Sequence, residues 1–262
     1  MKIKAKKSLG QHFLNDKGIA AQIVSSLKAD GIRHLIEVGP GMGALTPFLL
    51  QEARFDTRFV EVDADAAAYL KAHYPAIQDK LVVADFLQYP LDAYFGNVPL
   101  AVIGNFPYHI STQIFFKILD HRSQVKEVVG MLQKEVAERI ASPPGSKVYG
   151  ITSVLLQAFY NVEYLFTVHE HVFIPPPKVK SGVVRLTRNN VENLPCNEKL
   201  FVNIVKTAFN QRRKMLGNSL KSILPARMNT ENFSSVFSKR PEQLAVQDFI
   251  ELTQLIEKEL FT

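Results

Sequence analysis

The feature that most constrains the fold is a regular alternation between short apolar runs and helix-like stretches. Four apolar runs, each ending at Gly, Asp or Asn, occupy residues 34–39, 57–63, 80–85 and 100–105. Helical patterns lie between and after them, at residues 44–53, 64–74 and 111–121. Alternation of this kind predicts βαβ units, and hence an α/β fold with a mostly parallel sheet covered by helices on both faces.

Further apolar runs extend the predicted sheet, and the pattern then changes. Residues 127–133, 161–168 and 182–188 read as strands, and the last two suggest an antiparallel edge pair. The polar stretch 188–195 lacks periodicity and is interpreted as a linker. Helical patterns follow it at residues 199–209, 215–224, 230–237 and 246–260. We therefore predict two domains, one over residues 1–188 and a small, mostly helical one over residues 193–262.

Positive charge is concentrated in two tracts. The chain carries a net charge of +6, and four of its first seven residues are lysines. Between Lys199 and Arg227 there are seven Lys or Arg residues and no acid. Two such tracts suggest contacts with phosphate groups. The alternative is a solvated helix face together with a basic tail.

The remaining composition narrows the class of protein. One cysteine, Cys196, rules out an internal disulfide and agrees with a reducing cytoplasm. The seven histidines are scattered along the chain, so we expect no metal site. No long apolar run follows the basic N-terminus, so we expect neither a signal peptide nor a membrane span.

A glycine-rich turn and two acids mark the ends of three successive predicted strands. Gly39, Gly41 and Gly43 lie between a strand and a helix, where glycine lets the backbone approach a ligand closely. Glu61 ends the next strand, where an acid accepts hydrogen bonds from ribose hydroxyls. Asp85 ends the third and is followed by Phe86, which suits an adenine amino group and ring. Singly, each acid reads as a helix cap or surface group; together they predict an adenosine pocket.

The fourth predicted strand leaves the sheet through Asn-Phe-Pro-Tyr, residues 105–108. The Asn105 side-chain oxygen and the Phe106 carbonyl can accept the two N–H groups of an adenine N6 amine, which draws out its lone pair. Pro107 restricts Phe106 to an extended conformation, and Tyr108 can stack on the base. A stacked base must leave its neighbours to reach such a slot. The alternative, an aromatic-rich core turn, fits the surrounding motifs poorly.

The glycine turn, the two acids and the Asn-Phe-Pro-Tyr turn occur in the order seen in S-adenosylmethionine-dependent methyltransferases that modify adenine N6. Four further stretches resemble the ribosomal RNA adenine dimethyltransferase family. They are KKSLGQHFLND at 6–16, MLQKEVAERI at 131–140, FIPPPKVKSGVVRL at 173–186 and AFNQRRKMLGNSLK at 208–221. The resemblance covers nearly the whole chain.

This resemblance implies a class I, Rossmann-like methyltransferase domain over residues 1–188 and a helical domain that binds RNA or the ribosome over residues 193–262. It implies S-adenosyl-L-methionine as methyl donor, with no metal. The expected substrate is a pair of adjacent adenosines in the hairpin loop near the 3′ end of 16S rRNA, within the 30S subunit or its late precursor. A role in small-subunit biogenesis, as a cytoplasmic monomer, is expected with it.

The resemblance also assigns residues. It implies that Gln11, His12 and Leu14 lie near the methionine end of the cofactor and that Phe173 closes the face of the base opposite Tyr108. Many relatives carry Asn where this chain has His12, so an imidazole contact there would depend on pH. Phe106 replaces a Leu or Ile common in relatives. Transfer is expected to be direct and in line, without a carboxylate or histidine base.

Three other functions remain as alternatives. A nicotinamide-dependent oxidoreductase would use the glycine turn and Glu61 but has no use for the Asn-Phe-Pro-Tyr turn. An RNA-binding assembly factor that has lost catalysis would not need that turn intact. An antibiotic-resistance methyltransferase of large-subunit rRNA shares the turn, and the identity of the modified rRNA would distinguish it.

Overall fold

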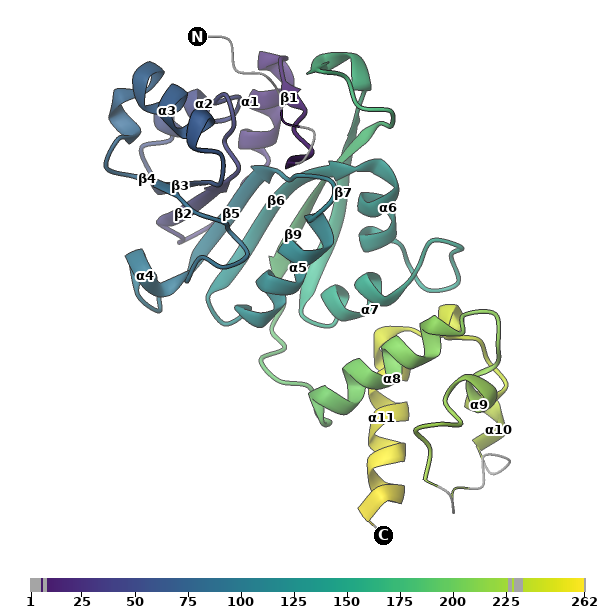
Figure 1. Ribbon diagram of the computed structural model, residues 1–262. Coiled ribbons are helices and arrows are strands. Elements are labelled where there is room, and N and C mark those ends of the chain that lie inside the picture. Colours follow the sequence, from purple (N-terminus) through teal and green to yellow (C-terminus); the bar gives the residue numbers. More distant parts are fainter. Residues whose placement is uncertain (1–5, 7–8, 226–227, 229–232, 262) are drawn as a thin grey trace. The chain divides into compact units, whose positions relative to one another are not determined.

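A computed structural model describes residues 6, 9–225, 228 and 233–261, which form two compact units (Figure 1). Three of the four N-terminal lysines, Arg227 and the first part of the helix predicted at 230–237 lie outside the described residues. The first unit comprises the chain up to Glu138 together with Asn161–Arg188. The second comprises Arg139–Tyr160 and the chain from Asn189 onward.

A seven-stranded sheet forms the centre of the first unit, with the strand order β4-β3-β2-β5-β6-β9-β7. The bounds are β2 His34–Val38, β3 Asp56–Glu61, β4 Leu81–Val83, β5 Leu100–Asn105, β6 Val125–Gln133, β7 Tyr160–Val168 and β9 Ser181–Arg188. The pairs from β4 through β6 are parallel, whereas β9 is antiparallel to β6. The predicted α/β class with a mostly parallel sheet is confirmed. The two predicted final strands are neighbours at one edge, with β7 outermost.

Strand order reverses between β2 and β5, because the chain moves outward from β2 to β3 and β4 and then returns to the other side of β2. In open α/β sheets, ligands bind outside the carboxyl ends of the strands at such a reversal. The residues that follow β2 and β5 are the glycine turn and the Asn-Phe-Pro-Tyr turn. The topology therefore brings the two most distinctive sequence motifs to one place.

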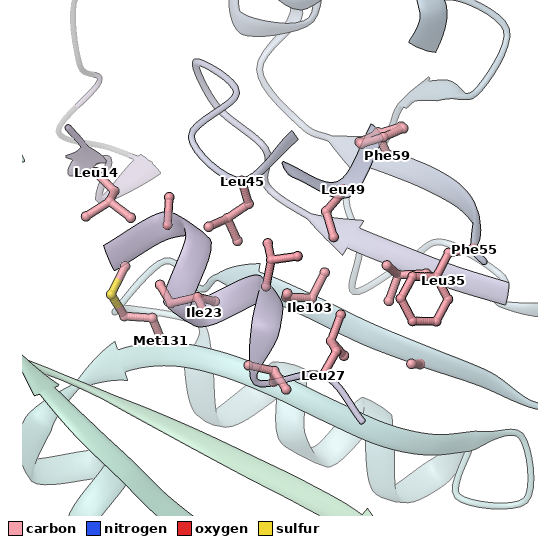
Figure 2. Packing of buried hydrophobic residues seen from close by; sticks show 14 of the residues in the cluster. Leu14, Ile23, Leu27, Leu35, Leu45, Leu49, Phe55, Phe59, Ile103 and Met131 are labelled. Carbon is pink, nitrogen blue, oxygen red and sulfur yellow. The ribbon is translucent and has the colours of Figure 1, made fainter. Parts of the chain in front are cut away.

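Helices α1 (Lys17–Ser25), α2 (Thr46–Gln51) and α3 (Ala64–His73) contribute to a core on one face of the sheet. Figure 2 shows Ile23 and Leu27 beside Ile103 and Met131, all buried in one cluster. Side chains alternate along a strand, so the neighbours of Ile103 in β5 point to the other face. Helix α5 (Ser111–Asp120) lies in front of the sheet in Figure 1 and buries Ile114, Phe115 and Ile118. Helix α1 was not predicted from the sequence.

Short local signals start these helices. The side chain of Asp16 accepts a hydrogen bond from the Ile19 N–H at 2.9 Å, and that of Asp63 accepts from the Asp65 N–H at 3.0 Å. Each carboxylate satisfies a backbone donor that the first helical turn leaves unpaired. Asp63 thus has a local role, which matters below because the N-terminal segment also binds it.

The remaining elements of the first unit are short. They include α4 (Asp92–Phe95), the first part of α6 (Lys134–Ala141), and the two-residue strands β1 (Phe13–Leu14) and β8 (Phe173–Ile174). Strands β1 and β8 pair antiparallel, with Phe13 opposite Ile174 and Leu14 opposite Phe173. This pairing joins the N-terminal segment to a part of the chain about 160 residues away in sequence.

The second unit is helical, and it contains α7 (Ile151–Gln157), α8 (Glu198–Asn210), α9 (Leu216–Ser219), α10 (Ser234–Phe237) and α11 (Val246–Phe261). Helices α8 and α11 lie side by side, and both contact α7. This packing explains why the segment that carries α7 groups with the C-terminal helices. The helix predicted at 215–224 is limited to the four residues of α9, and a turn follows it at residues 221–223.

Candidate active site

The glycine turn begins where β2 ends, at the strand-order reversal. Gly39, Gly41 and Gly43 have φ values of 65°, 59° and 81°, which L residues with a side chain rarely adopt. A Cβ built on Gly39 would meet no atom within 4 Å, so open space adjoins this turn. Close approach of a ligand is one reason for glycine at these positions, and the positive φ angles are a second.

Glu61 ends β3 beside this turn and is only 3% exposed. Its carboxylate accepts hydrogen bonds from the Gly41 N–H at 2.8 Å and the Asp63 N–H at 2.9 Å. Burial raises the pKa of the Glu61 carboxyl, whereas these two N–H groups favour its charged form. Glu61 therefore fixes the glycine turn and presents a buried acceptor at the strand end.

Glu37 is a second buried acid at this place, and the sequence analysis does not single it out. It lies within β2, is 1% exposed and accepts a hydrogen bond from the Thr46 hydroxyl at 2.9 Å. Burial raises its pKa to about 8, with the nearby Glu61 adding to the effect. An acid inside an otherwise apolar strand was the available sequence signal, because such a residue is rarely buried without a purpose.

Glu37 should make the stability of the protein depend on pH. Its pKa is about 8 in the folded state against an ordinary value of 4.5, so the folded state holds the extra proton between these values. Stability should therefore fall as pH rises through that window and level off above it. Glu37→Gln should flatten this fall and raise the thermal midpoint relative to wild type at about pH 9, with little change at about pH 5. Thermal unfolding at both pH values checks this, and an unchanged slope in the variant would assign the dependence to another group.

The Asn-Phe-Pro-Tyr turn continues from β5 on the other side of β2. The Asn105 side-chain N–H donates to the His12 carbonyl at 3.0 Å, which directs the amide so that its oxygen is the remaining acceptor. The Phe106 N–H donates to the Met131 carbonyl at 2.9 Å, and its ring is buried. The Tyr108 hydroxyl is 2.6 Å from the Ser181 hydroxyl, which anchors the tip of that ring.

The N-terminal segment lies beside both turns. His12 Nδ1 is 2.8 Å from the Pro175 carbonyl oxygen, and the imidazole stacks on Tyr108 with ring centroids 5.5 Å apart. The Gln11 side-chain N–H donates to the Asp63 carboxylate at 3.0 Å, and Lys6 Nζ lies 2.6 Å from the same carboxylate. The segment is thereby joined to the N-terminus of α3 as well as to β8 and β5.

These elements enclose a cleft of about 1000 Å³. Ten of the sequence-predicted site residues line it: Gln11, His12, Leu14, Gly39, Gly41, Glu61, Asn105, Phe106, Pro107 and Tyr108. The other four, which are Gly43, Asp85, Phe86 and Phe173, are outside its lining. The structure thus brings together the ends of β2, β3 and β5 and the N-terminal segment.

The four outlying residues have identifiable positions. A Cβ on Gly43 would lie 2.5 Å from the Tyr74 ring, so this glycine allows close packing of α3. Asp85 is exposed and accepts a hydrogen bond from the Leu87 N–H at 2.9 Å, and Phe86 is buried next to it. Phe173 is 2% exposed and packs in the core cluster that contains Leu14. Its assignment to one face of a bound base stays a prediction.

Helix α3 contributes cleft residues that the sequence analysis does not anticipate. Tyr69 and His73 stack on each other with ring centroids 3.8 Å apart, and both line the cleft together with Tyr74. Their spacing of four residues places the Tyr69 and His73 side chains on one face of the helix, which was the available signal. Aromatic walls of this kind suit a planar ring or a cation.

Over residues 6, 9–225, 228 and 233–261, no three His, Cys, Asp or Glu side chains gather in a way that would hold a metal ion. Within that same part of the chain, no helix has the length and apolar character needed to cross a membrane.

The cleft combines groups suited to a nucleoside that carries positive charge. Glu37 and Glu61 supply buried carboxyls, and the turn at Gly39 leaves room for a ligand next to the backbone. Asn105, Phe106 and Tyr108 line the same cleft, and they supply an amide oxygen, a backbone carbonyl and an aromatic ring. Two acceptors next to an aromatic ring can orient a planar amine. The arrangement therefore suits group transfer between a bound nucleoside and an aromatic amine.

Comparison with known proteins identifies close relatives over the whole length of the chain. The family model described as ribosomal RNA adenine dimethylase matches residues 2–258. A protein of Cytophaga hutchinsonii named ribosomal RNA small subunit methyltransferase A is 55% identical over 97% of this chain and 98% of its own length. The protein of the same name from Porphyromonas gingivalis is 54% identical over 98% of this chain and 100% of its own length.

Solved structures agree on the fold. A dimethyladenosine transferase from Plasmodium falciparum superposes with a TM-score of 0.78, at 24% identity over 95% of this chain and 98% of its own. The 23S rRNA methyltransferase ErmE superposes with a TM-score of 0.69, at 25% identity over 92% of this chain and 99% of its own. The expected class I, Rossmann-like methyltransferase fold is confirmed by these similarities and by the sheet order.

Proposed function

The chain belongs to the ribosomal RNA adenine dimethylase family, and from this membership we propose that it is a 16S rRNA adenine N6-dimethyltransferase. It transfers methyl groups from S-adenosyl-L-methionine to N6 of two adjacent adenosines in the hairpin loop near the 3′ end of that RNA, within the 30S subunit or its late precursor. The observation that carries the proposal is 54–55% identity, over nearly the full length, to relatives named for the small subunit. Identity to the 23S rRNA methyltransferase ErmE is 25%.

The residues of the cleft fit S-adenosyl-L-methionine. This molecule carries an ammonium and a sulfonium, and a cation bound in the cleft would favour the charged forms of the Glu37 and Glu61 carboxyls, whose pKa values burial raises. The backbone at Gly39 adjoins open space. Glu61 would accept from the ribose, Asp85 from the adenine amine, and Gln11, His12 and Leu14 would border the methionine end. When bound, the molecule supplies an electrophilic methyl group.

The residues of the Asn-Phe-Pro-Tyr turn hold and activate the acceptor amine. The Asn105 side-chain oxygen accepts one N6 hydrogen and the Phe106 carbonyl accepts the other, which turns the nitrogen lone pair toward the incoming methyl group. Tyr108 stacks on the base, whereas Phe173, which is buried in the core cluster with Leu14, would have to leave that position to close the other face. Aromatic stacking contributes about 1–3 kcal/mol per base and offsets part of the cost of extruding the adenosine from its loop.

The two parts of the chain have different tasks in this proposal. Residues 1–188 carry the cofactor and the reacting amine, whereas residues 193–262 provide the basic surface that binds the ribosomal particle. The protein acts as a monomer in the cytoplasm, where its substrate is assembled. Binding of an immature particle would also delay its use, which gives the protein a role in small-subunit biogenesis.

The proposed function is tested by incubating the protein with labelled S-adenosyl-L-methionine and either undermethylated small subunits or large subunits. The labelled nucleotides are then mapped by mass spectrometry. We expect label on two adjacent adenosines near the 3′ end of the small-subunit RNA. Label on large-subunit RNA would identify the resistance-type activity instead, and label on neither RNA would contradict the proposal.

Cofactor affinity tests the two acids. Glu61→Gln and Asp85→Ala should each weaken S-adenosyl-L-methionine binding by about 1–3 kcal/mol, as hydrogen bonds that involve a charged or buried partner are lost. Isothermal titration calorimetry measures this. Asp30→Ala provides a control at an exposed acid of the same unit that is outside the cleft lining. Affinity equal to wild type in both variants would remove Glu61 and Asp85 from the site.

A further inference from the structure

Phe106 lies in a space that exists because two neighbouring strands carry glycine. Gly104 of β5 and Gly130 of β6 are direct partners in the parallel register. A Cβ on Gly130 would lie 2.4 Å from the Phe106 ring, and a Cβ on Gly104 would lie 2.9 Å from it. Both distances are well inside van der Waals contact, so the ring occupies the volume that two side chains would otherwise fill.

Other contacts fix Phe106 in this position. Its N–H donates at 2.9 Å to the carbonyl of Met131, the residue that follows Gly130. Its ring meets the edge of Phe115 from α5, with centroids 5.8 Å apart and planes at 79°. The side chain is 1% exposed. The backbone of this residue is thus held both by a hydrogen bond to β6 and by a ring seated against β5, β6 and α5.

The carbonyl oxygen of Phe106 has no hydrogen-bond donor among the described residues. Its capacity to accept a hydrogen bond is therefore unused within that part of the chain, and Phe106 is one of the residues that line the cleft. Pro107 restricts the Phe106 backbone to extended conformations. Within that range, a rotation of the backbone would move both the ring and the carbonyl oxygen. The position of the seated ring therefore sets the direction of the oxygen.

We propose that Gly130 is a positioning residue for methyl transfer: with Gly104 it forms a socket for the Phe106 ring, and the seated ring aims the Phe106 carbonyl at the acceptor amine. The inference rests on the proposed function, because it concerns the same amine. The size of residue 106 and the glycine at position 130 are matched to each other.

The two glycines make different predictions. The three atoms nearest to a Cβ on Gly130 all belong to the Phe106 ring, so a smaller residue at 106 should relieve the overlap. A Cβ on Gly104 would also lie 2.5 Å from the Val38 carbonyl oxygen, which is backbone of the central strand β2. A smaller residue at 106 cannot relieve that contact.

The experiment compares Gly130→Ala, Gly104→Ala and Phe106→Leu with the two double variants that contain Phe106→Leu. Single-turnover transfer to small subunits, S-adenosyl-L-methionine affinity and the thermal midpoint are measured for each. Gly130→Ala should slow transfer by about tenfold to a hundredfold, since small displacements of reacting groups have effects of this size. Its cofactor affinity should stay within about twofold, because the cofactor-holding turn after β2 is not altered. Adding Phe106→Leu should restore most of the rate and midpoint lost in Gly130→Ala but none of that lost in Gly104→Ala.

Gly150→Ala is the matched control, because its added Cβ would meet no atom closer than 3.8 Å and its φ of −159° suits any residue. It should retain the wild-type transfer rate. The proposal is overturned if Gly130→Ala transfers at the wild-type rate, or if Phe106→Leu fails to restore it. The thermal midpoints measure the packing of the socket and do not depend on methyl transfer. If the wild-type protein transferred no methyl group, the proposed function would be contradicted, but the midpoints would still test the packing of Gly130 against Phe106.

Discussion

Asn105→Ala should lower the single-turnover rate of methyl transfer at least about a hundredfold, the scale of losing one positioned polar group in an active site. The Asn105 side-chain nitrogen donates to the His12 carbonyl, so its oxygen is directed as an acceptor for the amine. Alanine removes that acceptor and leaves the Phe106 carbonyl alone to draw out the lone pair. Rapid-quench measurement with saturating cofactor separates this loss from any change in cofactor binding.

Tyr108→Phe gives a matched comparison within the same turn. It removes the hydroxyl that lies 2.6 Å from the Ser181 hydroxyl but keeps the ring that would stack on the base. We therefore expect a loss of less than about tenfold, as for one ordinary hydrogen bond. Cofactor affinity of Asn105→Ala should change by only a few-fold. Transfer by Asn105→Ala at a rate near that of wild type would refute the proposed activation of N6.

The parts of the fold that local patterns encode were predictable from the sequence. Each of the apolar runs before Gly39, Glu61 and Asn105 forms a strand of the parallel sheet. Parallel strands place their carboxyl ends at one edge, so the motifs at the ends of β2, β3 and β5 indicate one site, whereas Asp85, which follows β4, lies outside the cleft lining. The glycine turn was predictable for a similar reason. Its positive φ angles favour glycine locally, independent of contacts with distant parts of the chain.

Features that depend on distant pairing were not predictable. Strand β1 is only two residues long and forms against Phe173 and Ile174, which no local pattern announces. The pairing also places the Phe173 ring in the core beside Leu14 rather than in the cleft lining. The buried position of Glu37 has the same origin, because its neighbours β3 and β5 exclude water from a residue that reads as polar in isolation. Likewise, the match between Gly130 and Phe106 becomes visible only in the register of β5 and β6.

The basic tract of the second unit also looks different once its contacts are known. Arg212, Arg213 and Lys214 are equivalent in the sequence, but Arg212 donates to the Ser146 carbonyl at 3.1 Å and lies over the Phe209 ring at 5.9 Å. Its guanidinium is also 3.9 Å from the Glu242 carboxylate. Arg212 therefore contributes to the packing of its own unit. Arg213, Lys214 and Lys221 are exposed, which makes them the better probes of phosphate binding.

Replacing Arg213, Lys214 and Lys221 together by Glu should abolish binding to small subunits at moderate salt. Each lysine or arginine that neutralises a phosphate releases a bound counterion, and its reversal to an acid adds repulsion to that loss. Wild-type binding should for the same reason weaken steeply as salt is raised, and the variant should lose most of this dependence. Co-sedimentation with small subunits over a salt series measures both effects. Affinity for S-adenosyl-L-methionine should be retained, because the cleft is lined by residues of the first unit alone.

A control with the same change in net charge separates a docking surface from general electrostatics. Lys28, Arg33 and Lys71 are exposed residues of the first unit outside the cleft lining, and their joint replacement by Glu alters the total charge equally. If the helical unit docks on the particle, the control should bind far better than the triple variant at every salt concentration. Equal losses in the two variants would mean that overall charge, rather than this tract, attracts the particle. Co-sedimentation of the triple variant at the wild-type level would move the contact elsewhere, with the lysines at the N-terminus as the next basic tract to test.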